Sequence, residues 1–113
     1  MRARPEVLRE LLEATHPTET LVRELSQFGW DSEVELELLR RRHLIAMLDS
    51  FLAGRKTASD VRRWAEAIEA RDDIGFEAGA EEVLKSAIFE LANPEITHNL
   101  SPLLAEKIRR DLA

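Results

Sequence analysis

The chain of 113 residues contains no cysteine and only 4 glycines and 4 prolines. Without cysteine, the protein has no disulfide scaffold, no thiol nucleophile and no cysteine-ligated zinc site. No apolar run approaches the roughly 18 residues of a membrane-spanning helix. Charged residues also interrupt the apolar part of the N-terminal segment, unlike in a secretory signal. These absences predict a soluble cytoplasmic protein that is not embedded in a membrane.

The composition favours one folded domain. Hydrophobic residues make up 44% of the chain and charged residues 34%, with 22 acidic residues against 16 basic ones. A chain of this length buries roughly two thirds of the surface that its unfolded form exposes, so it needs no metal or disulfide to fold. We therefore expect a single domain spanning residues 1–113.

The apolar residues recur mostly at helical spacing. Ser32 and Glu35 have the spacing of a helix-capping box, and an apolar stripe follows them as far as Gly54. Residues 34–38 alternate between apolar and acidic, as in a strand, but the capping box favours a helix. Because this helix is apolar around much of its circumference, we expect it to be the central one.

Other helices are predicted on both sides of that segment. Pro5 opens one, the His16–Pro17 pair ends it, and Thr18 begins another. Further helices are expected from a Thr57 cap, over an apolar pattern in residues 80–91, and from a Ser101 cap. The pattern predicts an all-α fold, a single irregular helical bundle of five or six helices, with Trp64 in its core.

Residue patterns typical of enzymes are missing. His16, His43 and His98 are scattered, and none has the spacing of a metal-binding pair. The Gly-x-Ser-x-Gly sequence of a serine nucleophile is absent. The segment Gly54-Arg55-Lys56-Thr57 lacks the spacing of a phosphate-binding loop and reads as a connection between helices. We expect no enzyme activity, no cofactor and no metal.

Acidic residues concentrate in one segment. Residues 66–95 hold nine acidic side chains and two basic ones, a local net charge of −7. Their spacing lacks the alternating carboxylates of a calcium loop. Such a surface would speed the approach of a basic protein. The predicted partner-binding residues are Glu66, Glu69, Asp72, Asp73 and Glu77. Simple solubility is the other explanation of the same charges.

A basic segment precedes the acidic one and suggests an alternative function. Arg55, Lys56, Arg62 and Arg63 outweigh Asp60 between residues 55 and 63, a local charge of +3. The helix after Thr57 could then act as a DNA-recognition helix in a small regulatory protein. DNA-binding proteins normally carry a broad basic face, however, so nucleic acid is the less favoured partner. The arginines at 40–42 would extend such a face only if the two segments adjoin.

Four stretches carry a resemblance to known proteins. They are Phe51-Leu52-Ala53-Gly54, residues 64–69 (Trp-Ala-Glu-Ala-Ile-Glu), residues 71–77 (Arg-Asp-Asp-Ile-Gly-Phe-Glu) and residues 91–96 (Leu-Ala-Asn-Pro-Glu-Ile). The region of about residues 44–105 resembles small bacterial all-α proteins of uncharacterised function. It is more distantly similar to colicin-D-type immunity proteins. That resemblance implies an acidic bundle that occludes the basic active site of a tRNA-cleaving toxin. The arginines around Arg40 and Arg62 depart from this pattern and would have to face away from the toxin.

The leading hypothesis is therefore a non-catalytic protein-binding module, with a basic protein such as a bacterial toxin nuclease as its partner. The oligomeric state stays open. Phe28, Trp30 and Phe76 lie in predicted connections, where they either complete the core or form a dimer surface.

Overall fold

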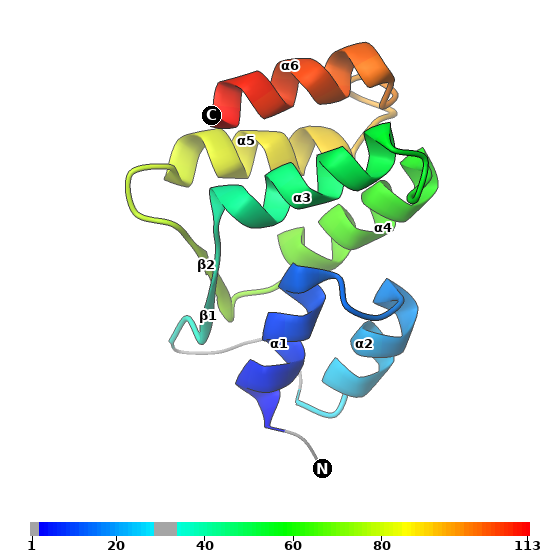
Figure 1. Cartoon of the computed structure of the whole chain (residues 1–113). Coiled ribbons are helices and arrows are strands. Elements are labelled where there is room, and N and C mark those ends of the chain that lie inside the picture. The colour runs from blue at the N-terminus through cyan, green and yellow to red at the C-terminus, as the bar shows by residue number, and fades with distance from the viewer. Residues whose placement is uncertain (1–2, 29–33) are drawn as a thin grey trace.

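A computed structural model describes residues 3–28 and 34–113 of the chain. In these ranges there are six α-helices and two short β-strands, so the predicted all-α class is confirmed (Figure 1). The helices are α1 (Arg4–Glu13), α2 (Thr18–Leu25), α3 (Arg41–Leu52), α4 (Ala58–Glu69), α5 (Glu81–Ala92) and α6 (Pro102–Leu112). The strands are β1 (Glu37–Leu39) and β2 (Ile74–Phe76).

Several helix ends follow the predicted signals. Thr57 caps α4 reciprocally with Asp60: the Asp60 N–H donates to Thr57 Oγ1 at 3.1 Å, and the Thr57 N–H donates to Asp60 Oδ2 at 2.8 Å. Ser101 Oγ accepts from the Leu104 N–H at the start of α6. Gly54, just after α3, has a φ of 81°, which glycine adopts without steric cost.

The helix predicted from Ser32 is wrong over its first part. Glu37–Leu39 form β1, which pairs in parallel with β2, and α3 begins only at Arg41. The alternation in residues 34–38 indicated a strand, but it did not indicate the buried face, because Glu37 and Leu38 are both half-buried and Leu39 is the buried residue of β1. Ser32, the proposed cap, lies outside the described residues.

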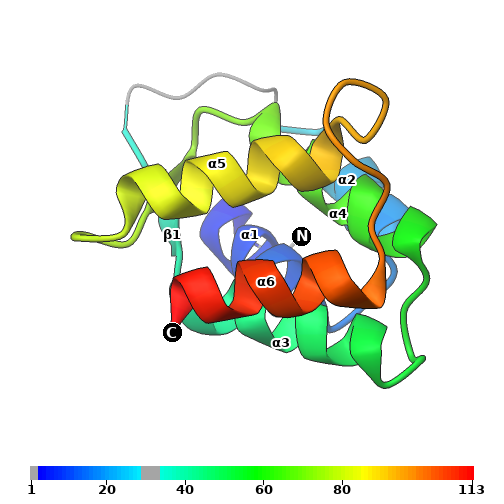
Figure 2. The same cartoon turned by 90° about the horizontal axis from the view of Figure 1, so that it is seen from above.

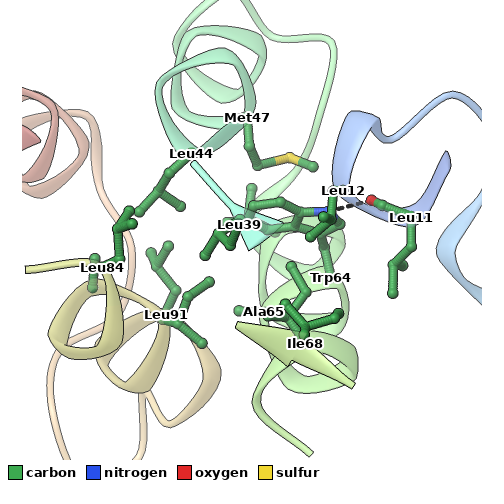
Figure 3. Close-up of a cluster of buried hydrophobic side chains, with 14 of the residues drawn as sticks. Leu11, Leu12, Leu39, Leu44, Met47, Trp64, Ala65, Ile68, Leu84 and Leu91 are labelled. Carbon is green, nitrogen blue, oxygen red and sulfur yellow. Dashed lines mark hydrogen bonds between the residues drawn. The ribbon is translucent and has the colours of Figure 1, made fainter. Parts of the chain in front are cut away.

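The core is centred on α4 rather than on the segment predicted to be central. α4 packs closely against α2, α3 and α5. Trp64, on α4, is fully buried, as predicted, and its indole N–H donates to the carbonyl of Leu11 in α1 at 2.8 Å (Figure 3). Phe28 and Phe76 are half-buried against the same core, while Trp30 lies outside the described residues.

Around α4 the other helices form two groups. In Figure 1, α1 and α2 lie on one side of α4, and α3, α5 and α6 lie on the other. Figure 2 shows α5 and α6 running side by side in opposite directions. Within the described residues, no helix has the length and apolar character needed to span a bilayer.

Candidate functional site

The five predicted contact residues do not share one surface, and Asp73 has no exposed surface at all. Its carboxylate accepts hydrogen bonds from Arg71 Nε at 2.8 Å and Arg71 Nη2 at 2.9 Å, and from Arg4 Nε at 2.8 Å. Its backbone carbonyl also accepts from the Leu36 N–H, just before β1. Asp73 therefore joins α1, β1 and the start of β2. Its prediction as a partner-binding residue is wrong, because its side chain is buried.

The same contacts determine the charge of Asp73. Burial by itself would raise the pKa of the carboxyl, because it penalises the ionised form. Hydrogen bonds from Arg71 and Arg4, together with their positive charges, outweigh that effect and hold the pKa below its usual range. Asp73 is therefore ionised at neutral pH in a site closed to solvent.

Glu77 also has a role inside the fold. Its Oε1 accepts from the backbone N–H of Arg41 at 2.8 Å, and its Oε2 lies 3.5 Å from the Arg41 guanidinium. The first turn of α3 contains no acidic residue, so Glu77 supplies from the β2–α5 connection the negative charge that a helix N-terminus favours. Its carboxylate is half-buried and lies at the start of α3.

The remaining predicted residues, Glu66, Glu69 and Asp72, are exposed. Arg62 lies 3.7 Å from Glu66 and 3.2 Å from Glu95, so it brings Glu95 next to Glu66. We call Glu66, Glu69, Asp72 and Glu95 the α4 acidic surface. Glu95 was not among the predicted contact residues, because it follows Pro94 in a loop whose position no local pattern reveals.

Among the described residues, few hydrogen bonds reach the carboxylates of Glu69 and Asp72. Within the described part of the chain, Glu69 accepts hydrogen bonds from the side-chain amide of Asn93, at the end of α5, at 3.2 Å. Among the residues that the structure describes, neither Glu69 nor Asp72 forms a salt bridge with an arginine or lysine. Within the α4 acidic surface, these are the two carboxylates that no arginine or lysine of the described residues neutralises.

The basic segment is largely compensated by carboxylates. Arg63 contacts Glu19 at 2.8 Å and Asp60 at 3.0 Å, while Arg62 contacts Glu66 and Glu95. These ion pairs lower the positive potential that DNA binding requires. The predicted alternative, a DNA-recognition helix after Thr57, corresponds to α4, which packs against α2, α3 and α5 but keeps Arg62 and Arg63 exposed.

The two basic segments do adjoin at one point. Arg42 and Lys56 line the same small hollow of about 120 Å³. Arg42 donates there to Glu13 at 2.7 Å, so its charge is compensated as well.

His43 is the one buried histidine among the described residues. Its Nδ1 accepts from the Arg40 N–H at 2.9 Å, and its Nε2 lies 3.1 Å from Glu13. An Nδ1 that accepts a hydrogen bond carries no proton, so Nε2–H is the donor to Glu13. Burial, then the charge of Arg42, lowers the pKa of His43 against the opposing effect of Glu13. Both ring nitrogens are engaged in holding the start of α3 against α1.

The other two histidines are exposed, at His16 and His98. Within residues 3–28 and 34–113, no three His, Asp or Glu side chains converge in a way that could hold a metal ion.

No protein-family model, curated protein or solved structure matches the chain. The likeness to colicin-D-type immunity proteins therefore depends only on the sequence stretches quoted above and stays a prediction.

Proposed function

We propose that the protein is a non-catalytic protein-binding module whose α4 acidic surface contacts a basic partner. The observation that supports it best is the pair of exposed carboxylates at the end of α4, Glu69 and Asp72, which carry no arginine or lysine counter-charge among the described residues. Asp73 is buried and pairs with Arg71, and Glu77 is half-buried and pairs with Arg41, so neither charge is left for a partner.

Electrostatics gives this surface its proposed role. Clustered carboxylates raise the rate at which a basic protein approaches and disfavour an acidic one. The contacts of Arg62 with Glu66 and Glu95 involve half-exposed side chains, and such pairs contribute only about 0–1 kcal/mol. A partner's arginine or lysine could therefore replace them at little cost.

The more specific form of the proposal is an immunity-type inhibitor. In the family that the chain resembles, an acidic helical bundle blocks the basic active site of a toxin nuclease. Inhibition here would be steric and electrostatic, through the α4 acidic surface, without turnover. Arg40 lies at the start of α3, whereas Arg62 lies within that surface, so an inhibitor would have to accommodate Arg62.

Affinity capture from the native host, followed by mass spectrometry, tests the proposal. We expect the wild-type protein to retain one strongly basic protein, and the double variant Glu69→Lys/Asp72→Lys to lose it. The matched control is Glu106→Lys/Asp111→Lys on α6, which changes the net charge equally at two other exposed positions. A partner that is retained or lost alike by both variants would remove the α4 acidic surface from the proposal.

A further inference from the structure

A shallow hollow lies between α2 and α4, beside the α4 acidic surface. Four residues of α2 and three of α4 line it, and we call it the α2–α4 hollow. Its volume of about 410 Å³ lies within the range of about 300–1,000 Å³ that is typical of ligand pockets. The two helices pack against each other here, so both sides of the hollow belong to the folded core structure.

The lining of the hollow is mostly apolar. Val22 and Ala67 are half-buried in it. Arg63 and Glu19 contribute their methylene stems, because Arg63 Nε lies 2.8 Å from Glu19 Oε1 and each charged end is occupied by the other. The lining contains two arginines and two glutamates, so its charges cancel. The hollow therefore favours an uncharged apolar group over an ion.

Glu66 connects this hollow to the α4 acidic surface. It belongs to that surface and also lines the hollow, next to Ala67. The exposed residues Arg62, Glu66 and Glu69 are four and three positions apart, so they share one face of α4. Glu69 is two residues beyond Ala67, which is about 3 Å along the axis of a helix. One short segment of a partner can therefore reach the hollow and the carboxylates together.

An apolar pocket supplies what the carboxylates lack. Complementary charges mainly speed encounter and select the partner, whereas most of the affinity of an interface comes from a few large side chains held in pockets. Exposed ion pairs are individually weak. Such pockets normally have a polar border, and the charged side chains around the α2–α4 hollow form one.

We propose that the α2–α4 hollow holds a large apolar side chain, such as tryptophan, from a basic segment of the partner. The lysines or arginines that flank it in that segment bind Glu66, Glu69 and Asp72. This inference rests on the proposed function, because it takes the α4 acidic surface as the contact face. It adds the kind of sequence that the partner presents, an apolar anchor between cations.

Three synthetic peptides, titrated into the intact ¹⁵N-labelled protein and followed by ¹H–¹⁵N NMR, test the inference. The first is Lys-Arg-Trp-Arg-Lys with both ends blocked. The second has serine in place of tryptophan, and the third has glutamate at the four basic positions.

We expect the first peptide to shift the amides of Val22 and Ala67 as well as those of Glu69 and Asp72, and the second to shift only the latter two. The first should bind about tenfold more tightly than the second, because part of the indole ring leaves water. It should also bind more tightly than the third, which the α4 acidic surface repels.

Two matched variants locate the effect. Ala67→Gln fills the hollow without changing the charge, so it should abolish the preference for the basic tryptophan peptide over the serine peptide. Ala70→Gln, at an exposed position of the same helix end and outside the hollow, should keep that preference.

The peptides separate this inference from the proposed function. Equal binding of the two basic peptides, or a basic tryptophan peptide that leaves Val22 and Ala67 unshifted, would overturn the hollow as an anchor site and leave the proposed function standing. Equal binding of the basic and acidic tryptophan peptides would overturn the proposed function, and this inference with it. The titrations of the wild type decide both points even if a variant misfolds.

Discussion

Two segments distant in sequence meet at one buried carboxylate. Arg4 and Asp73 are 69 positions apart, yet they form a 2.8 Å contact beside Arg71. Removing two cations and an anion from water is costly, and the cost is offset only while all three remain together. Asp73 thus stabilises the attachment of α1 to the strand pair.

Asp73→Asn should destabilise the protein by about 3–5 kcal/mol at pH 7, because both arginines lose their hydrogen bonds to a charged carboxylate in a closed site. Urea unfolding followed by circular dichroism measures this. Asp72→Asn, one position earlier but exposed, should change stability by less than about 0.5 kcal/mol. Similar values for both variants would contradict the role given to Asp73.

His43 makes stability depend on pH. Its pKa in the folded protein is lowered, so the unfolded chain binds a proton more readily. The contribution of His43 to the free energy of unfolding is therefore complete above pH ~6.5, the usual pKa of histidine. It is lost as the pH falls toward the pKa of His43 in the folded protein.

We expect the free energy of unfolding to fall between pH 7.5 and pH 5.5, and His43→Gln to flatten that dependence, since glutamine does not titrate. Asn99→Gln, at an exposed position, serves as the control and should leave the slope unchanged, because it removes no titrating group. Identical slopes for the wild type and His43→Gln would contradict this account.

At the scale of elements, the strand pair shows where local patterns mislead. Helix ends were predictable from short-range chemistry, as at Thr57 and Ser101, because a cap and its partner lie within three residues. β1 depends instead on β2, which follows two helices later, so its partner is invisible to any local pattern.

The end of α3 offers a test at this scale. Gly54 has a φ of 81°, and a Cβ placed there would meet no atom within 4 Å. Gly54→Ala should therefore cost about 1–2 kcal/mol for conformational reasons alone. Gly54→Asn should cost less, because asparagine tolerates this conformation better. Thermal unfolding of both variants measures the difference, and equal stability of the wild type and Gly54→Ala would show that the turn is not strained.

At the scale of the whole molecule, the sequence predicted a charge asymmetry but not its distribution in space. The acidic segment divides into buried Asp73, the helix-capping Glu77, and the exposed α4 acidic surface. Whether a carboxylate is buried depends on distant partners such as Arg4. The sequence alone therefore could not show which of the five predicted carboxylates are exposed. The exposed end of α4 is what remains for a basic partner.

The most direct test of this account is the affinity of the captured partner for three forms of the protein, measured by titration calorimetry at physiological salt. Glu69→Lys/Asp72→Lys should weaken binding by at least roughly 30-fold, because each reversal removes an interfacial charge pair and adds repulsion. Glu106→Lys/Asp111→Lys should bind like the wild type. Equal affinities for all three forms, or an equal loss in both variants, would contradict the assignment of the α4 acidic surface as the binding face.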